Sequence, residues 1–368
     1  MPATATTSWN RFTGLPRPWA AAVLALLAAL MLFGVTSGAG KERIEAAKPD
    51  AMRSEGMIGD HALYARILHR VEAGEPYYAA AAAEHRANHY PLRPFMTVRL
   101  PTLAWILSIT GLQGGVVLMV LLGFVTVLVW RRRLMCETEL PRYTRFAALL
   151  VAANLSQVAL AQWVLMHEVV TGVLIALALA LYRPERPWAA MAVVAVGLAI
   201  RETMLPVAML FGLFALVDRD WRAAGAWMAL GLAFLAAIAA HAAALAAVTT
   251  PADLASPGWH GMGGWPAYLS FIHTTSAIRF LPGWISALLV PLALLGWAAW
   301  RSRLALAVLG VQLGYALLLM LFARSNNFYW GLLVVPTLYA GLIFAPAALA
   351  ALVRSIRQSR LSAPPAMT

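Results

Sequence analysis

Apolar runs bounded by charged residues, glycine or proline recur along most of the chain. A membrane-crossing helix needs about 20 apolar residues, and most of these runs reach that length. They lie at about 19–38, 112–130, 146–165, 169–182, 187–200, 203–217, 223–248, 283–300, 304–323 and 329–350. The three runs between 169 and 217 are short, so we expect those helices to borrow polar residues at their ends or to lie deep among neighbours. The pattern predicts an all-α, polytopic membrane protein with about ten transmembrane helices.

Composition excludes a soluble enzyme. Apolar residues make up 61% of the 368 positions and charged residues 12%, about half the roughly 25% typical of soluble domains. The mean hydropathy is +0.72. The 28 basic and 16 acidic residues give a net charge of +12. The basic residues form no dense run beyond 131–133, so we interpret the charge as a determinant of membrane topology and expect no nucleic-acid partner.

The arrangement of arginines predicts that both termini are cytoplasmic. With that orientation, 16 of the 28 basic residues fall on the inner side, as the positive-inside rule requires. These are Arg11, Arg17, Arg131, Arg132, Arg133, Arg142, Arg145, Arg183, Arg186, Arg219, Arg222, Arg301, Arg303, Arg354, Arg357 and Arg360. The first run resembles a signal peptide, but its length and the lack of a clear cleavage site favour an uncleaved anchor.

The outer side carries two large loops within a single integral membrane domain, 1–368. The first, 39–111, holds nine basic and eight acidic residues, and the second is 249–282. All eight histidines fall outside or in the outward half of a helix, whereas the single cysteine, Cys136, falls inside. Any chemistry is therefore expected on the extracytoplasmic face.

An amphipathic helix is predicted in the first outer loop, from Asp60 to Gly74. Leu63, Ile67, Leu68 and Val71 recur at helical spacing, which favours a helix lying at the membrane surface. Asp60 at its start is open to two interpretations, as an N-cap that accepts backbone hydrogen bonds or as a functional carboxylate. The two interpretations are compatible.

A second candidate lies where the first outer loop returns to the membrane. Arg99 precedes a short apolar segment, 102–109, which is too short to span a bilayer and should lie at the interface or re-enter. Arg99 could extend to lipid headgroups or grip a phosphate in a bidentate manner.

Two short outer turns carry ionisable pairs. His167 and Glu168 lie between the third and fourth runs, and Arg201 and Glu202 between the fifth and sixth. Charges at such depth are costly unless they are paired or face a wet cavity, so these residues are functional candidates. The alternative is that Glu168 pairs with Arg201 and merely joins the two turns.

Three further outer residues complete the candidate set. Arg279 precedes Pro282, and Arg324 opens a run that ends at Tyr329. Either arginine could be a plain interfacial anchor. The spacing of His85 and His89 would suit a metal, but no second ligand pair accompanies it, so we expect no metal and no cofactor.

No nucleotide-binding motif occurs in the short inner connections, so nucleotide-activated donors have no evident docking site. The chain resembles the GT-C glycosyltransferases, which use polyprenyl-phosphate-linked sugars, and most closely their bacterial mannosyltransferase-like branch. The resemblance covers roughly 19–217. It rests on Gly59–Tyr64, Gly74–Tyr78, the stretch from Tyr90, Glu168–Leu181, Arg183–Pro187, Ile200–Thr203 and Leu205–Pro206. It departs from the branch with an Asp-Glu pair, because His61 follows Asp60.

The resemblance implies a bacterial plasma-membrane enzyme that transfers a sugar, with inversion, to a glycan or lipid acceptor of the cell envelope. A polyprenyl phosphate leaves without a proton, so the reaction needs one base and cations around the phosphate. Asp60 would be the base, and Arg201 with Arg279 or Arg324, and Arg99, would hold the phosphate. His61, His167, Glu168, Glu202 and Tyr329 would support them. The alternatives are a transporter or flippase and a non-catalytic envelope-assembly subunit.

Overall fold

The computed structural model describes residues 9–37, 58–138, 140, 143–156 and 161–361. These residues form helices and no strand, with isolated bridges between Asn10 and Trp300 and between Arg93 and Ala255. The predicted all-α class is therefore confirmed for the described part of the chain. The first part of the predicted outer loop 39–111, residues 39–57, lies outside the described residues.

The apolar helices overlap the predicted runs. They are α1 (Arg17–Thr36), α6 (Thr102–Glu137), α7 (Thr144–Leu155), α9 (His167–Leu181), α10 (Trp188–Ile200), α11 (Leu205–Val217), α12 (Trp221–Ala246), α14 (Trp284–Ala299), α15 (Arg303–Phe322) and α17 (Ala345–Leu361). Most of their bounds lie within two residues of a run, but α6 also includes the segment 102–109 and ends at Glu137, α7 ends at Leu155, and α17 begins inside the last run and continues beyond it. The other helices are α4 (Asp60–Glu72), α5 (Tyr77–Ala87), α8 (Ala161–Val164), α13 (Gly264–Thr275) and α16 (Val335–Leu338). The 3₁₀ helices are η1 (Phe95–Thr97), η4 (Glu202–Met204), η5 (Ala277–Phe280), η6 (Ser325–Leu333) and η7 (Tyr339–Ile343).

Four described helices are long and apolar enough to cross a membrane. They are α1, α12, α15 and the helical segment Phe95–Glu137, which includes α6. A bent pair, Val335–Ile343 with Ala345–Arg357, would make a fifth. Five shorter apolar helices accompany them. The helices are therefore those of a membrane-embedded protein, but the expected ten crossings are not confirmed, because half of the predicted runs form helices of 10–17 residues.

Helix α9 is the centre of the bundle. Its residues from His167 to Ala180 are all buried, and it packs against α10, α6 and η6. Gly172 permits the closest contact, since a Cβ there would collide with the carbonyl oxygen of Leu332 in η6. The expectation that the short runs lie among neighbours is confirmed for this helix.

The last predicted run, 329–350, is not one helix. It is divided into η6, α16, η7 and the start of α17, with a 51° bend before α17. Such breaks free backbone carbonyls that water cannot reach, so neighbouring side chains must satisfy them. Gln312 Nε2 donates to the Val334 carbonyl at 2.9 Å, and Trp297 Nε1 donates to the carbonyls of Thr337 at 3.2 Å and Leu338 at 3.0 Å.

The first outer loop contains the expected helix, α4, and a second helix, α5. Helix α4 buries Leu63, Ile67 and Leu68, and Arg70 joins it to α5 through an ion pair with Glu84. The segment 102–109 forms a short helix of its own, as expected. It lies within the bounds of α6, but Gly111, with φ of +67° and ψ of 166°, is not helical and separates it from the helix that follows.

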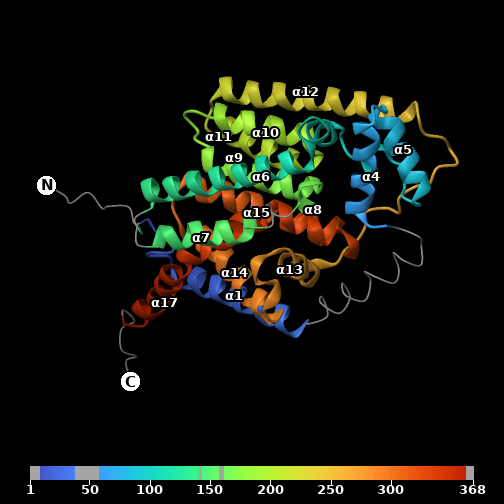
Figure 1. Cartoon of the computed structure of the whole chain (residues 1–368). Coiled ribbons are helices and arrows are strands. Elements are labelled where there is room, and N and C mark those ends of the chain that lie inside the picture. The colour runs from blue at the N-terminus through green and yellow to red at the C-terminus, as the bar shows by residue number, and fades with distance from the viewer. Residues whose placement is uncertain (1–8, 38–57, 139, 141–142, 157–160, 362–368) are drawn as a thin grey trace.

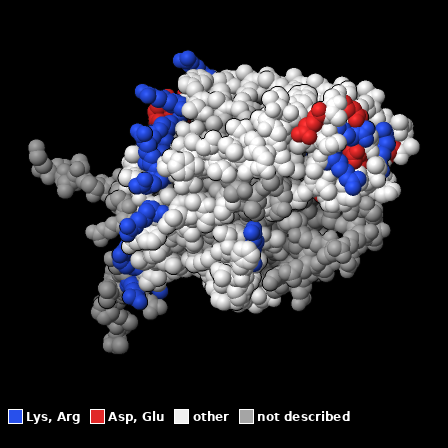
Figure 2. All heavy atoms as spheres, in the orientation of Figure 1, with Lys and Arg blue, Asp and Glu red and all other residues white. Residues whose placement is uncertain are grey.

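The two ends of the bundle differ in charge. Figure 1 places α4 and α5 at one end and the start of α1 and the end of α17 at the other. Figure 2 shows Lys and Arg side chains gathered along this second end, whereas acidic and basic side chains mix over α4 and α5. The segregation agrees with the predicted orientation, which stays a prediction. We call the end with the start of α1 and the end of α17 the arginine-rich end.

Candidate functional site

Asp60 follows Gly59, which caps the start of α4. Gly59 has φ of +84°, which favours glycine, and it occupies the N-cap position of the helix. Asp60 is the first helical residue instead. The interpretation of Asp60 as an N-cap is therefore wrong, and its carboxylate is left available for other contacts.

Three charged residues from separate elements meet beneath this helix. Glu168 is the second residue of α9, and its Oε1 lies 2.9 Å from Nη2 of Arg201 and 3.5 Å from Nη2 of Arg99. Arg201 lies between α10 and η4, and its Nη1 also lies 3.1 Å from Oε1 of Glu202. The predicted alternative pairing of Glu168 with Arg201 is confirmed, and Arg99 and Glu202 extend it into a network of four charges.

The network is buried at its centre and open at one side. The side chains of Glu168, Arg201 and Arg99 are 0%, 2% and 10% exposed. Glu202 is 29% exposed, and Asp60 is also partly exposed. A ligand that approaches from the solvent therefore reaches Asp60 and Glu202 before Glu168 or Arg201.

The surroundings of Asp60 raise the pKa of its carboxyl group. Desolvation is the largest cause, and the negative charge of Glu168 adds to it. The positive charge of Arg99, an interaction with the Tyr90 hydroxyl and His61 act in the opposite direction without cancelling the shift. A raised pKa makes the carboxylate a stronger base than an ordinary aspartate.

Aromatic rings surround the charged groups. The Arg99 guanidinium lies 5.9 Å from the ring centre of Tyr64, and the Tyr64 and His167 rings are 5.2 Å apart in an edge-on arrangement. The His61 ring makes a similar contact with Trp163, also at 5.2 Å. Burial is the main cause that raises the pKa of Tyr64, and Arg99 opposes it, so its hydroxyl stays protonated near neutral pH.

Tyr329 brings a fifth segment to the cluster. It lies in η6, and after burial the charge of Asp60 is the next cause that raises the pKa of its hydroxyl, with Arg99 and Arg201 acting against it. Its hydroxyl is therefore coupled electrostatically to all three residues. The hydroxyl is a neutral hydrogen-bond donor near neutral pH.

The charged residues of the cluster carry a net negative charge. Asp60, Glu168 and Glu202 against Arg99 and Arg201 give 2 − 3 = −1 when all are ionised. Nε of Arg99 and Nε of Arg201 are buried and have no hydrogen-bond partner among the described residues. Asp60 can therefore accept a proton without leaving the site strongly positive. The two Nε–H groups remain available to donate to a ligand.

The two remaining predicted arginines, Arg279 and Arg324, contact residues outside this network. Arg279 lies in η5, with its guanidinium 4.8 Å from the ring centre of Phe280. Arg324 donates from Nη1 to the Pro257 carbonyl at 3.4 Å. Within the described residues, neither forms an ion pair with a member of the network. Their assignment to a donor phosphate stays a prediction.

The structure also shows residues that the sequence did not single out for the site. Tyr64 and Tyr90 lie within the stretches that carry the resemblance, and nothing in the sequence pattern points to Trp163. Helix α13 was expected to be part of a loop, yet it is buried, and Trp265 donates from Nε1 to the Leu30 carbonyl at 3.0 Å. No group of three or more metal-binding side chains occurs among the described residues.

Comparisons with family models, with curated proteins and with solved structures found no match.

Proposed function

We propose that the chain is an inverting glycosyltransferase that moves a sugar from a polyprenyl-phosphate donor to a glycan or lipid acceptor of the cell envelope, on the extracytoplasmic face. The observation that carries the proposal is the position of Asp60. Asp60 is a partly exposed residue whose carboxyl group has a raised pKa and is coupled to the charge of Arg99. It begins α4, at the end of the bundle opposite the arginine-rich end (Figure 1). The resemblance to GT-C enzymes in the sequence points to the same residue.

The proposed step needs one base. Asp60 takes the proton from the acceptor hydroxyl while the oxygen forms a bond to the anomeric carbon of the sugar. The bond from that carbon to the phosphate oxygen breaks, and its electron pair stays on the polyprenyl phosphate. No acid is required for the leaving group, unlike in ordinary glycoside hydrolysis, and the sugar inverts because the acceptor attacks the face opposite the phosphate.

Arg99 is the cation best placed to stabilise the leaving phosphate. Its side chain keeps some exposure, and its Nε lacks a partner among the described residues, whereas Arg201 is almost fully buried. Arg201 then acts as a positioning residue that holds Glu168, and through it Arg99. Tyr64 and Tyr329 supply neutral hydroxyl donors. Arg279 and Arg324 remain candidates for additional phosphate contacts.

The test is an assay with purified protein in liposomes, a panel of polyprenyl-phosphate sugars and candidate acceptors. We expect a glycosidic product whose anomeric configuration, determined by NMR, is opposite to that of the donor. Movement of the lipid-linked sugar or of a small solute across the bilayer without any product would support a transporter instead. A retained configuration would contradict the single-displacement step.

A further inference from the structure

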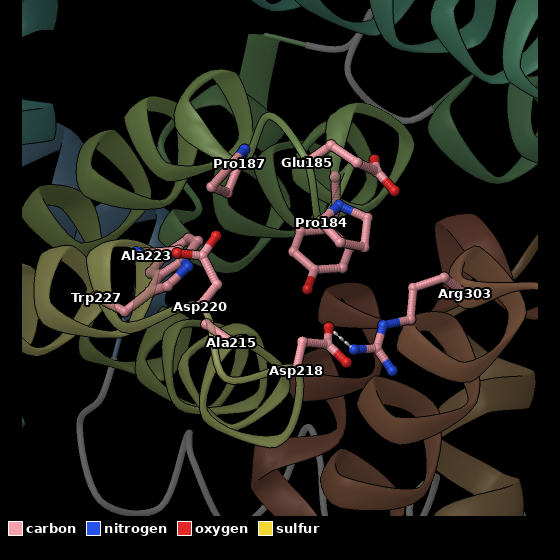
Figure 3. A pocket seen from close by; sticks show the side chains of 10 residues that line it. Pro184, Glu185, Pro187, Ala215, Asp218, Asp220, Ala223, Trp227 and Arg303 are labelled. Carbon is pink, nitrogen blue, oxygen red and sulfur yellow. Dashed lines mark hydrogen bonds and ion pairs between the residues drawn. The ribbon is translucent and has the colours of Figure 1, made fainter.

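A pocket opens at the arginine-rich end, at the opposite end of the bundle from α4 (Figure 1). It has a volume of about 430 Å³, within the range of roughly 300–1,000 Å³ typical of small-molecule sites. The connection from α9 to α10, the connection from α11 to α12 and the first turn of α15 surround it. Figure 3 shows Trp227 and Asp220 at one side of the pocket and the pair formed by Asp218 and Arg303 at the other.

Two aromatic side chains, Tyr182 and Trp227, line the pocket, and Phe211 packs against both. The rings of Tyr182 and Phe211 are stacked with centroids 4.0 Å apart, and Phe211 contacts Trp227 edge-on at 5.5 Å. Trp227 is 4% exposed. Its Nε1 is buried and has no hydrogen-bond acceptor among the described residues. A buried N–H group without an acceptor costs free energy. A ligand oxygen that accepts from this N–H would remove that cost.

The lining of the pocket has the opposite charge to its surroundings. It contains Glu185, Asp218 and Asp220 against Arg303 alone, which gives 1 − 3 = −2. Asp218 forms an ion pair with Arg303, and Asp220 accepts a hydrogen bond from the backbone N–H of Ala223 at 3.0 Å. The carboxylates of Glu185 and Asp220 therefore keep acceptor capacity for a cation.

We propose that this pocket binds a phosphoethanolamine group, in which a primary ammonium lies beside a phosphate. The ammonium donates to the carboxylates of Glu185 and Asp220. One phosphate oxygen accepts from Nε1 of Trp227 and another accepts from the guanidinium of Arg303. The pocket lies at the polar ends of apolar helices, where we expect lipid headgroups to lie if these helices cross the membrane. The group therefore comes either from a phosphatidylethanolamine lipid or from a free headgroup.

Native mass spectrometry of the full chain can measure this binding. Phosphatidylethanolamine, phosphatidylcholine and phosphatidylglycerol of the same acyl chains would be titrated separately, and soluble glycerophosphoethanolamine would be tested by calorimetry. We expect phosphatidylethanolamine to bind most tightly, because the trimethylated choline cannot donate hydrogen bonds to carboxylates. Binding of the soluble compound as well would identify the free headgroup as sufficient.

Variants assign the binding to the pocket. Trp227→Phe keeps the ring and removes the N–H, and we expect it to weaken binding about three- to tenfold, the value of one hydrogen bond. Glu185→Gln combined with Asp220→Asn should remove the preference for ethanolamine over choline, while Asn can still cap α12. Trp188→Phe, at an exposed tryptophan that contacts Arg222 at the same end, is the matched control and should bind as wild type.

Three results would overturn the proposal. The first is equal binding of the choline and ethanolamine lipids by the wild-type protein. The second is a Trp227→Phe variant that binds as tightly as Trp188→Phe. The third is a tighter binding of phosphatidylglycerol that depends on Trp227, which would mean that the pocket recognises an anion and not a zwitterion.

Discussion

Removing the charge of Glu168 should destabilise the protein strongly. The substitution Glu168→Gln leaves the guanidiniums of Arg201 and Arg99, which lie 2.9 and 3.5 Å from Oε1, without their shared counter-ion. Breaking a buried pair by removing one partner costs about 3–5 kcal/mol. Glu202 still pairs with Arg201, so we expect a loss near the lower value, about 3 kcal/mol. Reversible unfolding in mixed detergent micelles, followed by tryptophan fluorescence, measures the free energy.

Two further variants complete this experiment. Glu72→Gln makes the same change at an exposed position of α4 and should alter the free energy of unfolding by less than about 0.5 kcal/mol. In the double variant Glu168→Gln with Arg201→Gln, the second change removes one stranded charge, so the combined loss should be smaller than the sum of the single losses. A loss below about 1 kcal/mol for Glu168→Gln, or full additivity in the double variant, would refute the reasoning.

Three other predictions follow from single residues. Because the pKa of Asp60 is raised in the folded state, its contribution to stability is lost as pH rises through that pKa, so Asp60→Asn should unfold at a higher temperature than wild type at neutral pH but not below pH 3. Gly172→Ala should cost about 1–3 kcal/mol, seen as a lower unfolding temperature, because its Cβ meets the Leu332 carbonyl; a neutral effect would contradict the packing. A membrane-impermeant thiol reagent should label the exposed Cys136 in inverted vesicles and not in intact cells, and the reverse would invert the topology.

The apolar pattern predicts which segments become helices because burial of apolar side chains depends on local sequence. The boundaries of α9 and α10 lie within two residues of the predicted runs. The pattern cannot show that the run 329–350 is broken, since Gln312 and Trp297, which satisfy the freed carbonyls, belong to other helices. It also missed α13, whose glycine-rich start is typical of a loop.

The candidate site was predictable in part. The depth of the two outer turns pointed to Glu168 and Arg201 as a pair, because isolated charges are costly there. That Arg99 joins the same carboxylate depends on how α6 enters the bundle beside α9. The raised pKa of Asp60 depends on both, since it reflects desolvation and the nearby charge of Glu168. Neither follows from spacing along the chain.

The rate of sugar transfer by the Asp60→Asn protein tests the central claim most directly. The variant keeps the shape of the side chain and removes its basicity, so a correctly folded protein should lose transfer by about 100-fold or more, while Glu72→Gln retains it. Donor binding should persist, since Arg99 is unchanged. Transfer by Asp60→Asn at the rate of the Glu72→Gln control would contradict the assignment of Asp60 as the base.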